Sequence, residues 1–217
     1  LSSGGEFINY KRMKYNFYGE KAIKGLEGLM DLKFKYGILP DFFGIINEEI
    51  SQEMFYKDKN VAVYIGDSRF IRDLDSEYKA GNGFNFDTAN FPRRDNNLPN
   101  ILSNGISSYG IVKNEDPKKA EMCAKFLKYL TRDSNQKTLE DIGLFTVKNT
   151  IKDMYVVNIK TKRIEGSLQY PKYIPLMDTY LEIEKIVHEE IKSAILGEKK
   201  SYEAIEDAKT RVEVLYK

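Results

Sequence analysis

The chain has 217 residues, which is long enough to bury a sizeable hydrophobic core as one large domain or as two lobes. Hydrophobic residues make up 41% and charged residues 31%, a balance typical of globular proteins rather than disordered ones. The 34 Lys and Arg residues nearly cancel the 33 Asp and Glu residues, so the net charge is +1. Neither nucleic acid nor an anionic membrane is therefore expected as the main partner. No segment approaches the roughly 18–20 apolar residues that span a bilayer.

The chain carries little information about its compartment. It begins at Leu1 without the charged and apolar regions of a signal peptide, so we expect a processed or cut chain whose export signal lies elsewhere. Its one cysteine, Cys123, cannot form an internal disulfide and therefore indicates neither an oxidising nor a reducing environment.

The first third of the chain alternates helical and strand patterns. Residues 20–36 repeat apolar side chains at helical spacing and are followed by Gly37, a common stop signal. Asn47 is suited to cap a second helix that ends near residue 57. Residues 60–67 are rich in β-branched and aromatic side chains, which predicts a buried strand that leads into a loop.

The middle of the chain continues in the same way. Residues 84–92 and 107–114 have patterns typical of strands. Asp116 and Pro117 supply an N-cap and a first-turn proline for a strong helix that ends near residue 131. The predicted inner face of this helix consists of Ala120, Cys123, Ala124, Leu127 and Leu130.

Two amphipathic helices complete the pattern, near residues 180–196 and 202–216, the first ended by Gly197. No internal repeat or low-complexity linker interrupts the chain. Short strands that alternate with more numerous helices predict an α/β fold.

Catalytic and metal-binding patterns are missing from the sequence. The only histidine, His188, lies in a helical run, and together with one distant cysteine it does not supply the three or four ligands of a zinc site. A Ser-His-Asp or Cys-His site would have to use this same histidine, and no Walker loop or G-x-G-x-x-G motif indicates a nucleotide cofactor. Carboxylates such as Glu189 and Glu190 are expected on a solvated helix face rather than as the opposed pair of a glycosidase. We therefore expect a binder of small solutes, with no catalytic residue, cofactor or metal.

Five ordered segments form a pattern that is more specific than any one of them. They are LSSGGEFI with KAIKGLEGLMDLKFKYGILPD, then NVAVYIGDSRF, FNFDTANFPRRDNN, SSYGIVKNEDPKKAEMCAKFLKYLTRDSNQ and ILGEKKSYEAIEDAKTRVEVLY. In this order they resemble bacterial extracellular solute-binding proteins of carbohydrate ABC importers, the superfamily that includes maltose-binding protein. Only the C-terminal half of that family is represented.

This resemblance implies a periplasmic-binding-protein-like, type II two-lobe α/β fold from which most of the N-terminal lobe is absent. It implies that residues 1–103 form the first part of the C-terminal lobe, that 104–150 cross into the N-terminal lobe, and that 151–217 return. The crossings would be hinge strands near residues 100–106 and 148–154.

The resemblance also implies six ligand-binding residues: Asp67, Arg69, Ser107, Ser108, Tyr109 and Tyr173. Arg69 stands where the family often has a tryptophan that stacks on the sugar, and the chain contains no Trp. A guanidinium can stack in the same way, and it also makes forked hydrogen bonds to carboxylate, sulfate or phosphate. The alternatives are an ordinary exposed arginine at Arg69 and a turn-capping aspartate at Asp67.

The implied function is that of a substrate-binding subunit of an ABC importer. Such a subunit closes its two lobes around a sugar or oligosaccharide and delivers it to a permease in the membrane. The protein would be extracellular, either a cell-surface lipoprotein or periplasmic, and would act as a monomer without nucleic acid.

Three alternatives stay open at this point. Arg69 in place of a tryptophan also suits a receptor for an acidic ligand, such as a sugar acid or a polyol phosphate. From other classes, the chain could be a glycan-active enzyme domain or a stand-alone interaction module.

Overall fold

The structure, a computed structural model, describes residues 3–40, 47–93, 95, 97, 102–103, 108–169, 171–172, 175 and 177–216. By its internal contacts the chain divides into two compact units. Unit 1 consists of Leu1–Ile50, Phe91–Asn104 and Lys172–Lys217, and unit 2 consists of Ser51–Asn90 and Gly105–Pro171. Contacts within this chain define the units, whereas the topology of relatives defines the lobes, so the lobe boundaries after residues 103 and 150 stay a prediction.

Unit 1 begins with a strand hairpin and a long helix. Strands β1 (Ile8–Asn9) and β2 (Lys14–Tyr15) pair antiparallel, with Ile8 opposite Tyr15. Helix α1 (Gly19–Met30) continues as the π-helical turn η1 (Asp31–Lys35), which confirms the helix predicted for this segment.

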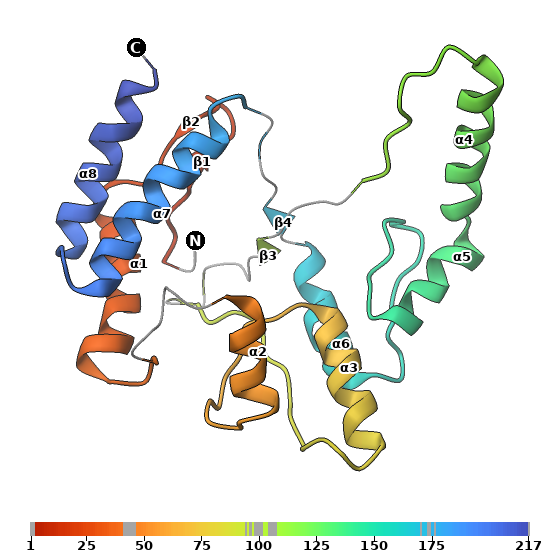
Figure 1. The fold of residues 1–217 in the computed structure, drawn as a ribbon, viewed down its shortest axis with the longest axis horizontal. Coiled ribbons are helices and arrows are strands. Elements are labelled where there is room, and N and C mark those ends of the chain that lie inside the picture. Colours follow the sequence, from red (N-terminus) through yellow and green to blue (C-terminus); the bar gives the residue numbers. More distant parts are fainter. Residues whose placement is uncertain are drawn as a thin grey trace. The chain divides into compact units, whose positions relative to one another are not determined.

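Helices α7 (Tyr180–Leu196) and α8 (Ser201–Val214) form a hairpin against which α1 packs (Figure 1). Helix α7 ends at Gly197, whose φ of 85° lies in the left-handed region that glycine adopts without steric cost. Before α8, the backbone N–H of Lys200 donates to Glu203 Oε2 over 2.8 Å, as in a capping box. Both helices confirm the sequence prediction.

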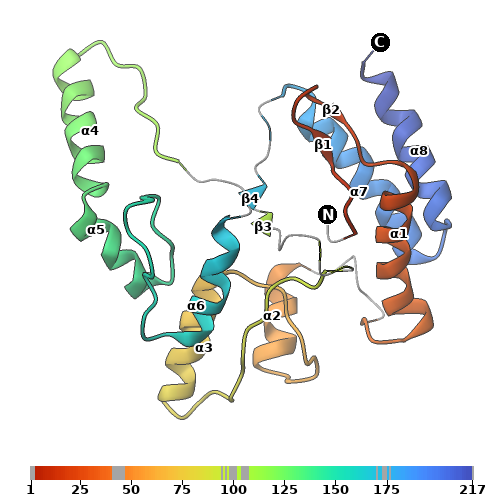
Figure 2. The ribbon, with the colours of Figure 1, turned by 180° about the vertical axis from the view of Figure 1, so that it is seen from behind.

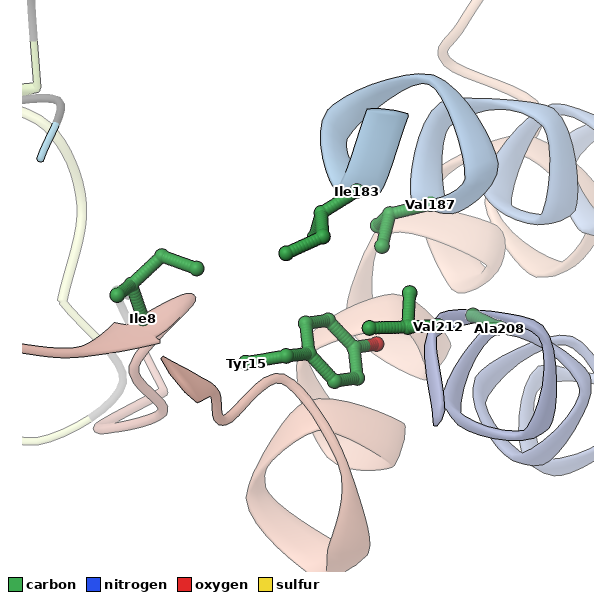
Figure 3. Close-up of a cluster of buried hydrophobic side chains, with 6 residues drawn as sticks. All are labelled: Ile8, Tyr15, Ile183, Val187, Ala208 and Val212. Carbon is green, nitrogen blue, oxygen red and sulfur yellow. The ribbon is translucent and has the colours of Figure 1, made fainter. Parts of the chain in front are cut away.

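Two clusters of buried apolar side chains hold unit 1 together. Figure 3 shows the first, which contains Ile8, Tyr15, Ile183, Val187, Ala208 and Val212. The second contains Ala22, Leu26, Ala194, Ala204 and Ile205. On each helix the buried positions recur every three or four residues, so one face of each helix is covered by its neighbours.

Glu190 on α7 contradicts the expectation of a solvated carboxylate, because it is only 6% exposed. It accepts hydrogen bonds from Lys199 Nζ at 2.5 Å and from Arg211 Nη1 at 2.7 Å. Burial raises the pKa of this carboxyl, but its two cationic partners outweigh burial, and the pKa of Glu190 lies below its ordinary value. Helical spacing alone does not reveal the cations that α8 and the preceding loop bring to this position.

Unit 2 contains short helices joined by extended segments. They are most of α2 (Glu48–Tyr56), α3 (Ser68–Lys79), α4 (Pro117–Leu130), α5 (Asp133–Lys137), η2 (Thr138–Ile142), α6 (Ile159–Glu165) and η3 (Gly166–Gln169). The predicted caps of α2 and α4 are confirmed: Asn47 Oδ1 accepts from the Ile50 N–H, and Asp116 Oδ1 accepts from the Lys118 N–H, both at 2.9 Å. Elsewhere in the chain, the two-residue strands β3 (Leu102–Ser103) and β4 (Pro171–Lys172) pair with each other.

Helices α3 and α6 lie side by side in unit 2 (Figures 1 and 2). Lys160 Nζ lies 2.5 Å from Asp75 Oδ1, and Asn158 Nδ2 donates to the other oxygen of Asp75 over 2.9 Å. The extended segment that follows α3 joins the same framework, because Thr88 Oγ1 donates to the carbonyl of Lys160 at 2.7 Å. Lys160 Nζ also lies 3.8 Å from the centroid of the Phe86 ring. These contacts fix α3, α6 and the adjoining extended segment against one another.

The strands predicted from sequence in unit 2 are not present. Residues 60–67 and 84–92 are described throughout and form no strand, and neither do residues 108–114 of the third predicted strand. Several of their apolar side chains face solvent: Val63 is 81% exposed and Val112 is 85% exposed. A strand requires a neighbouring strand that satisfies its backbone groups, and the described part of the chain pairs no strand with these segments.

Helix α4 also lacks the buried face that its sequence predicts. None of its described residues is buried. Cys123, which was expected in the core, is exposed, and Met122 and Phe126 are 61% and 58% exposed. The predicted inner face is half-buried at Ala120, Ala124, Leu127 and Leu130, and the exposed Met122 and Phe126 lie outside it.

Candidate ligand-binding loop

The loop that ends in Asp67 leads directly into helix α3. Asp67 is the N-cap of this helix, and its Oδ1 accepts a hydrogen bond from the Phe70 N–H at 3.1 Å. The capping role of Asp67 is therefore confirmed, and a ligand contact by the same side chain stays a prediction. Helix α3 itself was not predicted, although the spacing of its buried residues Ile71 and Leu74 after this cap was a usable signal.

Asp67 and Arg69 form an ion pair at the start of α3. Arg69 donates from Nε at 3.0 Å and from Nη2 at 2.6 Å, and both bonds reach Asp67 Oδ2. The side chains are 62% exposed for Arg69 and 40% exposed for Asp67. Burial raises the pKa of Asp67, but the Arg69 guanidinium and the Phe70 N–H outweigh it, so the pKa lies below its ordinary value. Asp67 is thus a carboxylate at neutral pH.

An aromatic cluster packs beside this loop. The rings of Tyr64 and Phe70 meet edge to face with centroids 5.0 Å apart, and Phe55 contacts both. Phe84 joins the cluster at 5.3 Å from Phe55. A Cβ on Gly66 would lie 2.4 Å from the Tyr64 ring, so any other residue at this position would require the ring to move.

The turn at Gly143 also approaches the start of α3 closely. Gly143 follows η2 with a φ of 72°, and a Cβ there would lie 3.0 Å from both Arg69 Cα and Ser68 O. The turn at Gly143 therefore packs directly on the first residues of α3. Backbone contacts and aromatic packing thus hold the Asp67–Arg69 pair on a preorganised loop.

The other predicted site residues are less constrained. Ser108 and Tyr109 are exposed, Tyr109 by 79%, in the extended segment before α4. Ser107 and Tyr173 lie outside the described residues. The structure therefore brings Asp67 and Arg69 into contact, while the contribution of the remaining four stays a prediction.

An open hollow of about 480 Å³ lies elsewhere on unit 2, lined by Asn85, Phe86, Asp87, Ile159, Lys160 and Arg163. Sequence reasoning did not identify it. Its cations are already engaged, because Lys160 pairs with Asp75 and Arg163 Nη1 lies 2.5 Å from Asp87 Oδ1. These pairs join α6 to α3 and to the extended segment, so they have a structural explanation.

Metal-ligand clusters and membrane-spanning helices are not found among the described residues. Among them, no group of three His, Cys, Asp or Glu side chains is placed to hold a metal ion. His188 is exposed on α7, as expected for a surface helix residue. Within the same part of the chain, no helix combines the length and apolar character needed to cross a bilayer.

Comparison with known proteins identifies solved structures with a similar fold. No protein-family model matches the sequence, and no curated protein matches it. Among solved structures, maltose-bound MalE3 of Thermotoga maritima is 17% identical and aligns over 99% of this chain and 55% of its own, with a TM-score of 0.69. An ABC transporter solute-binding protein of Thermotoga lettingae bound with α-D-tagatose is 21% identical over 100% of this chain and 54% of its own, with a TM-score of 0.73.

A third similar structure gives the same picture. The maltose-maltodextrin binding protein of Alicyclobacillus acidocaldarius is 14% identical over 98% of this chain and 57% of its own, with a TM-score of 0.70. The chain thus spans about half the length of the solved proteins that it matches. The resemblance found in the sequence is confirmed at the level of the fold: the chain has the α/β, type II fold of these solved solute-binding proteins, aligned over about half of their length.

Proposed function

We propose that the protein is the substrate-binding subunit of an ABC importer and captures a sugar or oligosaccharide. The observation that carries this proposal is the alignment of nearly the entire chain with sugar-bound or sugar-binding transport proteins. Delivery to a membrane permease, an extracellular place as a lipoprotein or in the periplasm, and action as a monomer without catalysis belong to the same proposal.

The lobe assignment is part of this proposal. Residues 1–103 and 151–217 would belong to the C-terminal lobe, and 104–150 to the N-terminal lobe. The exposed apolar side chains of α4 support it, because Met122, Phe126 and Tyr129 are each at least half exposed on a helix whose sequence is amphipathic. A helix that packs on the remainder of a second lobe would carry such a face.

The ligand would contact the preorganised loop of unit 2. Asp67 and Arg69 offer a carboxylate and a guanidinium, which together accept from and donate to sugar hydroxyls. Ser107, Ser108, Tyr109 and Tyr173 would add hydroxyl and aromatic contacts. Closure of the lobes would be a population shift driven by contacts that both lobes make with the sugar.

Nuclear magnetic resonance titration with maltose and with α-D-tagatose tests the proposal on this chain, because the method detects the weak binding expected of an incomplete cleft. We expect shifts concentrated on residues 66–70 and 108–109, and a loss of these shifts in Arg69→Ala. Arg72→Ala is the matched control, since Arg72 lies one turn further along α3 and pairs with Asp73. Shifts confined to other surfaces, or equal responses in both variants, would contradict the proposed site.

The acidic-ligand alternative is less well supported than a neutral sugar. The guanidinium that suggested it is paired with Asp67 rather than set among other cations. Titration with galacturonate beside galactose separates the two alternatives, and a preference for galacturonate would favour the acidic ligand. Release of product from a glycan panel would instead indicate a glycan-active enzyme domain.

A further inference from the structure

Asp67 uses both of its carboxylate oxygens within the loop. Oδ1 accepts from the Phe70 N–H at 3.1 Å, which caps α3. Oδ2 accepts from Nε and Nη2 of Arg69 at 3.0 and 2.6 Å. One carboxylate thus accepts hydrogen bonds from two electropositive groups, a helix N-terminus and a guanidinium.

This arrangement determines what the loop can bind. Nε and Nη2 form one of the two edges through which arginine makes forked contacts with carboxylate, sulfate or phosphate, and Asp67 already lies on that edge. An anionic ligand would have to displace Asp67 from this edge, and at either edge it would be repelled by the charge of Asp67. A hydroxyl both donates and accepts, so it can bind to the carboxylate and the guanidinium without separating them.

The next charged residues on α3 also form an ion pair. Arg72 is paired with its neighbour Asp73, so the first two turns of the helix carry two cations and two anions in adjacent pairs. Because the turn at Gly143 packs on the backbone of Ser68 and Arg69, Arg69 lies in the first turn of α3 at a fixed backbone position beside Asp67. The pairing is therefore a built feature of the loop.

We propose that Asp67 is a specificity-determining residue that holds Arg69 and makes the loop select uncharged, polyhydroxylated ligands and exclude anions. The sugar-selecting part of this inference rests on the proposed function. The anion-excluding part depends only on the loop.

The variant Asp67→Asn tests the inference, because asparagine is as good an N-cap as aspartate but carries no charge. Sodium sulfate is the probe, and the Nε–Hε resonance of Arg69 is the readout. We expect sulfate to bind at Arg69 several-fold more tightly in Asp67→Asn than in the unaltered protein. Asp73→Asn is the control, since it removes one negative charge from the same helix at a carboxylate that pairs with Arg72, and its Arg69 resonance should respond as in the unaltered protein.

Two outcomes of the sulfate titration would overturn the inference. One is an equal sulfate affinity at Arg69 with and without Asp67. The other is an equal gain in Asp67→Asn and Asp73→Asn, which would reduce the effect to net charge. Unchanged circular dichroism and thermal unfolding of Asp67→Asn establish that the cap and helix are intact.

A second titration separates this inference from the proposed function. Galactose and galacturonate differ by one carboxylate, and we expect Asp67→Asn to shift the preference toward galacturonate several-fold. A sulfate effect at Arg69 with no response of residues 66–70 to any sugar would overturn the proposed function and leave the anion-excluding role of Asp67 supported. Sugar binding with unchanged preference would overturn the specificity role alone.

Discussion

Helices α8 and α4 are both 14 residues long, yet they have opposite relations to the chain around them. Helix α8 in unit 1 buries Ser201, Ala204, Ile205, Ala208 and Val212. Helix α4 in unit 2 buries none of its described residues. Since both sequences are amphipathic, the difference lies in what packs against them: α8 finds α1 and α7 within the chain, and the described part of the chain covers no comparable face of α4.

The two units differ in how completely the described chain covers their apolar side chains. Unit 1 encloses two apolar clusters, in which Ile183, Ala204 and Ile205 are each 0% exposed. Unit 2 leaves large apolar side chains in solvent on α4 and on the extended segments before α3 and α4, with Val63 and Val112 both more than 80% exposed. We therefore expect substitutions of apolar residues to have large effects in unit 1 and small effects on α4.

The largest effect is expected at the centre of unit 1. Ile183→Ala removes a fully buried side chain and should lower the free energy of unfolding by about 2–5 kcal/mol. Leu181→Ala on the same helix changes a side chain that is 72% exposed and should stay within about 0.5 kcal/mol. Urea unfolding followed by circular dichroism measures both, and similar losses for the two variants would mean that unit 1 is not packed as described.

A smaller effect is expected from the buried carboxylate of unit 1. Glu190→Gln leaves Lys199 and Arg211 without their shared partner and should cost about 1–3 kcal/mol at pH 7. The folded pKa of Glu190 is lowered, so its contribution is complete above the unfolded value of 4.5 and is lost as pH falls through the folded pKa.

Urea titrations at neutral and acidic pH check this dependence. The difference between the unaltered protein and Glu190→Gln should shrink as the pH falls below 4.5. Glu189→Gln is the control, because Glu189 pairs with the same Arg211 while its side chain is 46% exposed, and it should cost less than about 1 kcal/mol. A difference that is independent of pH would remove the ionised Glu190 from the stability of unit 1.

The smallest effect on stability is expected on α4. Phe126→Ser replaces a side chain that is 58% exposed and should change the free energy of unfolding by less than about 0.5 kcal/mol. It should also reduce binding of the dye ANS, which reports exposed apolar surface. Lys125→Ser is the matched control, with no reduction expected. A loss of several kcal/mol in Phe126→Ser would mean that this chain does cover α4, and the contrast between the units would fail.

How much the sequence could predict differs between local and distant interactions. The helices at α1, α2, α4, α7 and α8 were predicted because their spacing, caps and stop signals are local. The three strands were predicted wrongly, because the same apolar pattern forms a strand only beside a partner segment. Helix α3 was missed because its first residues were interpreted through the family as a binding loop, although Asp67, Ile71 and Leu74 carried a helical signal.

The candidate site was predictable to a similar extent. The sequence and its resemblance identified Asp67 and Arg69, and the capping role of Asp67 was among the alternatives. The hydrogen bonds between the two side chains could not be predicted, because a loop that adopts another backbone conformation would separate them. The close approach of Gly143 to Ser68 and Arg69 joins segments that are distant in the chain, so no local pattern predicts it.

The hydrogen bond from the Tyr15 N–H to Tyr216 Oη, 2.9 Å long, joins two residues that are 201 positions apart. The same ends of the chain meet where α1 packs on α7 and α8. During synthesis the hairpin and α1 therefore emerge from the ribosome well before their partners α7 and α8, which lie far later in the sequence. Contacts of such high sequence separation also slow folding. The apolar surface of α1, including Ala22 and Leu26, therefore stays uncovered until α7 and α8 have been synthesised, although it belongs to the better packed unit once they are in place.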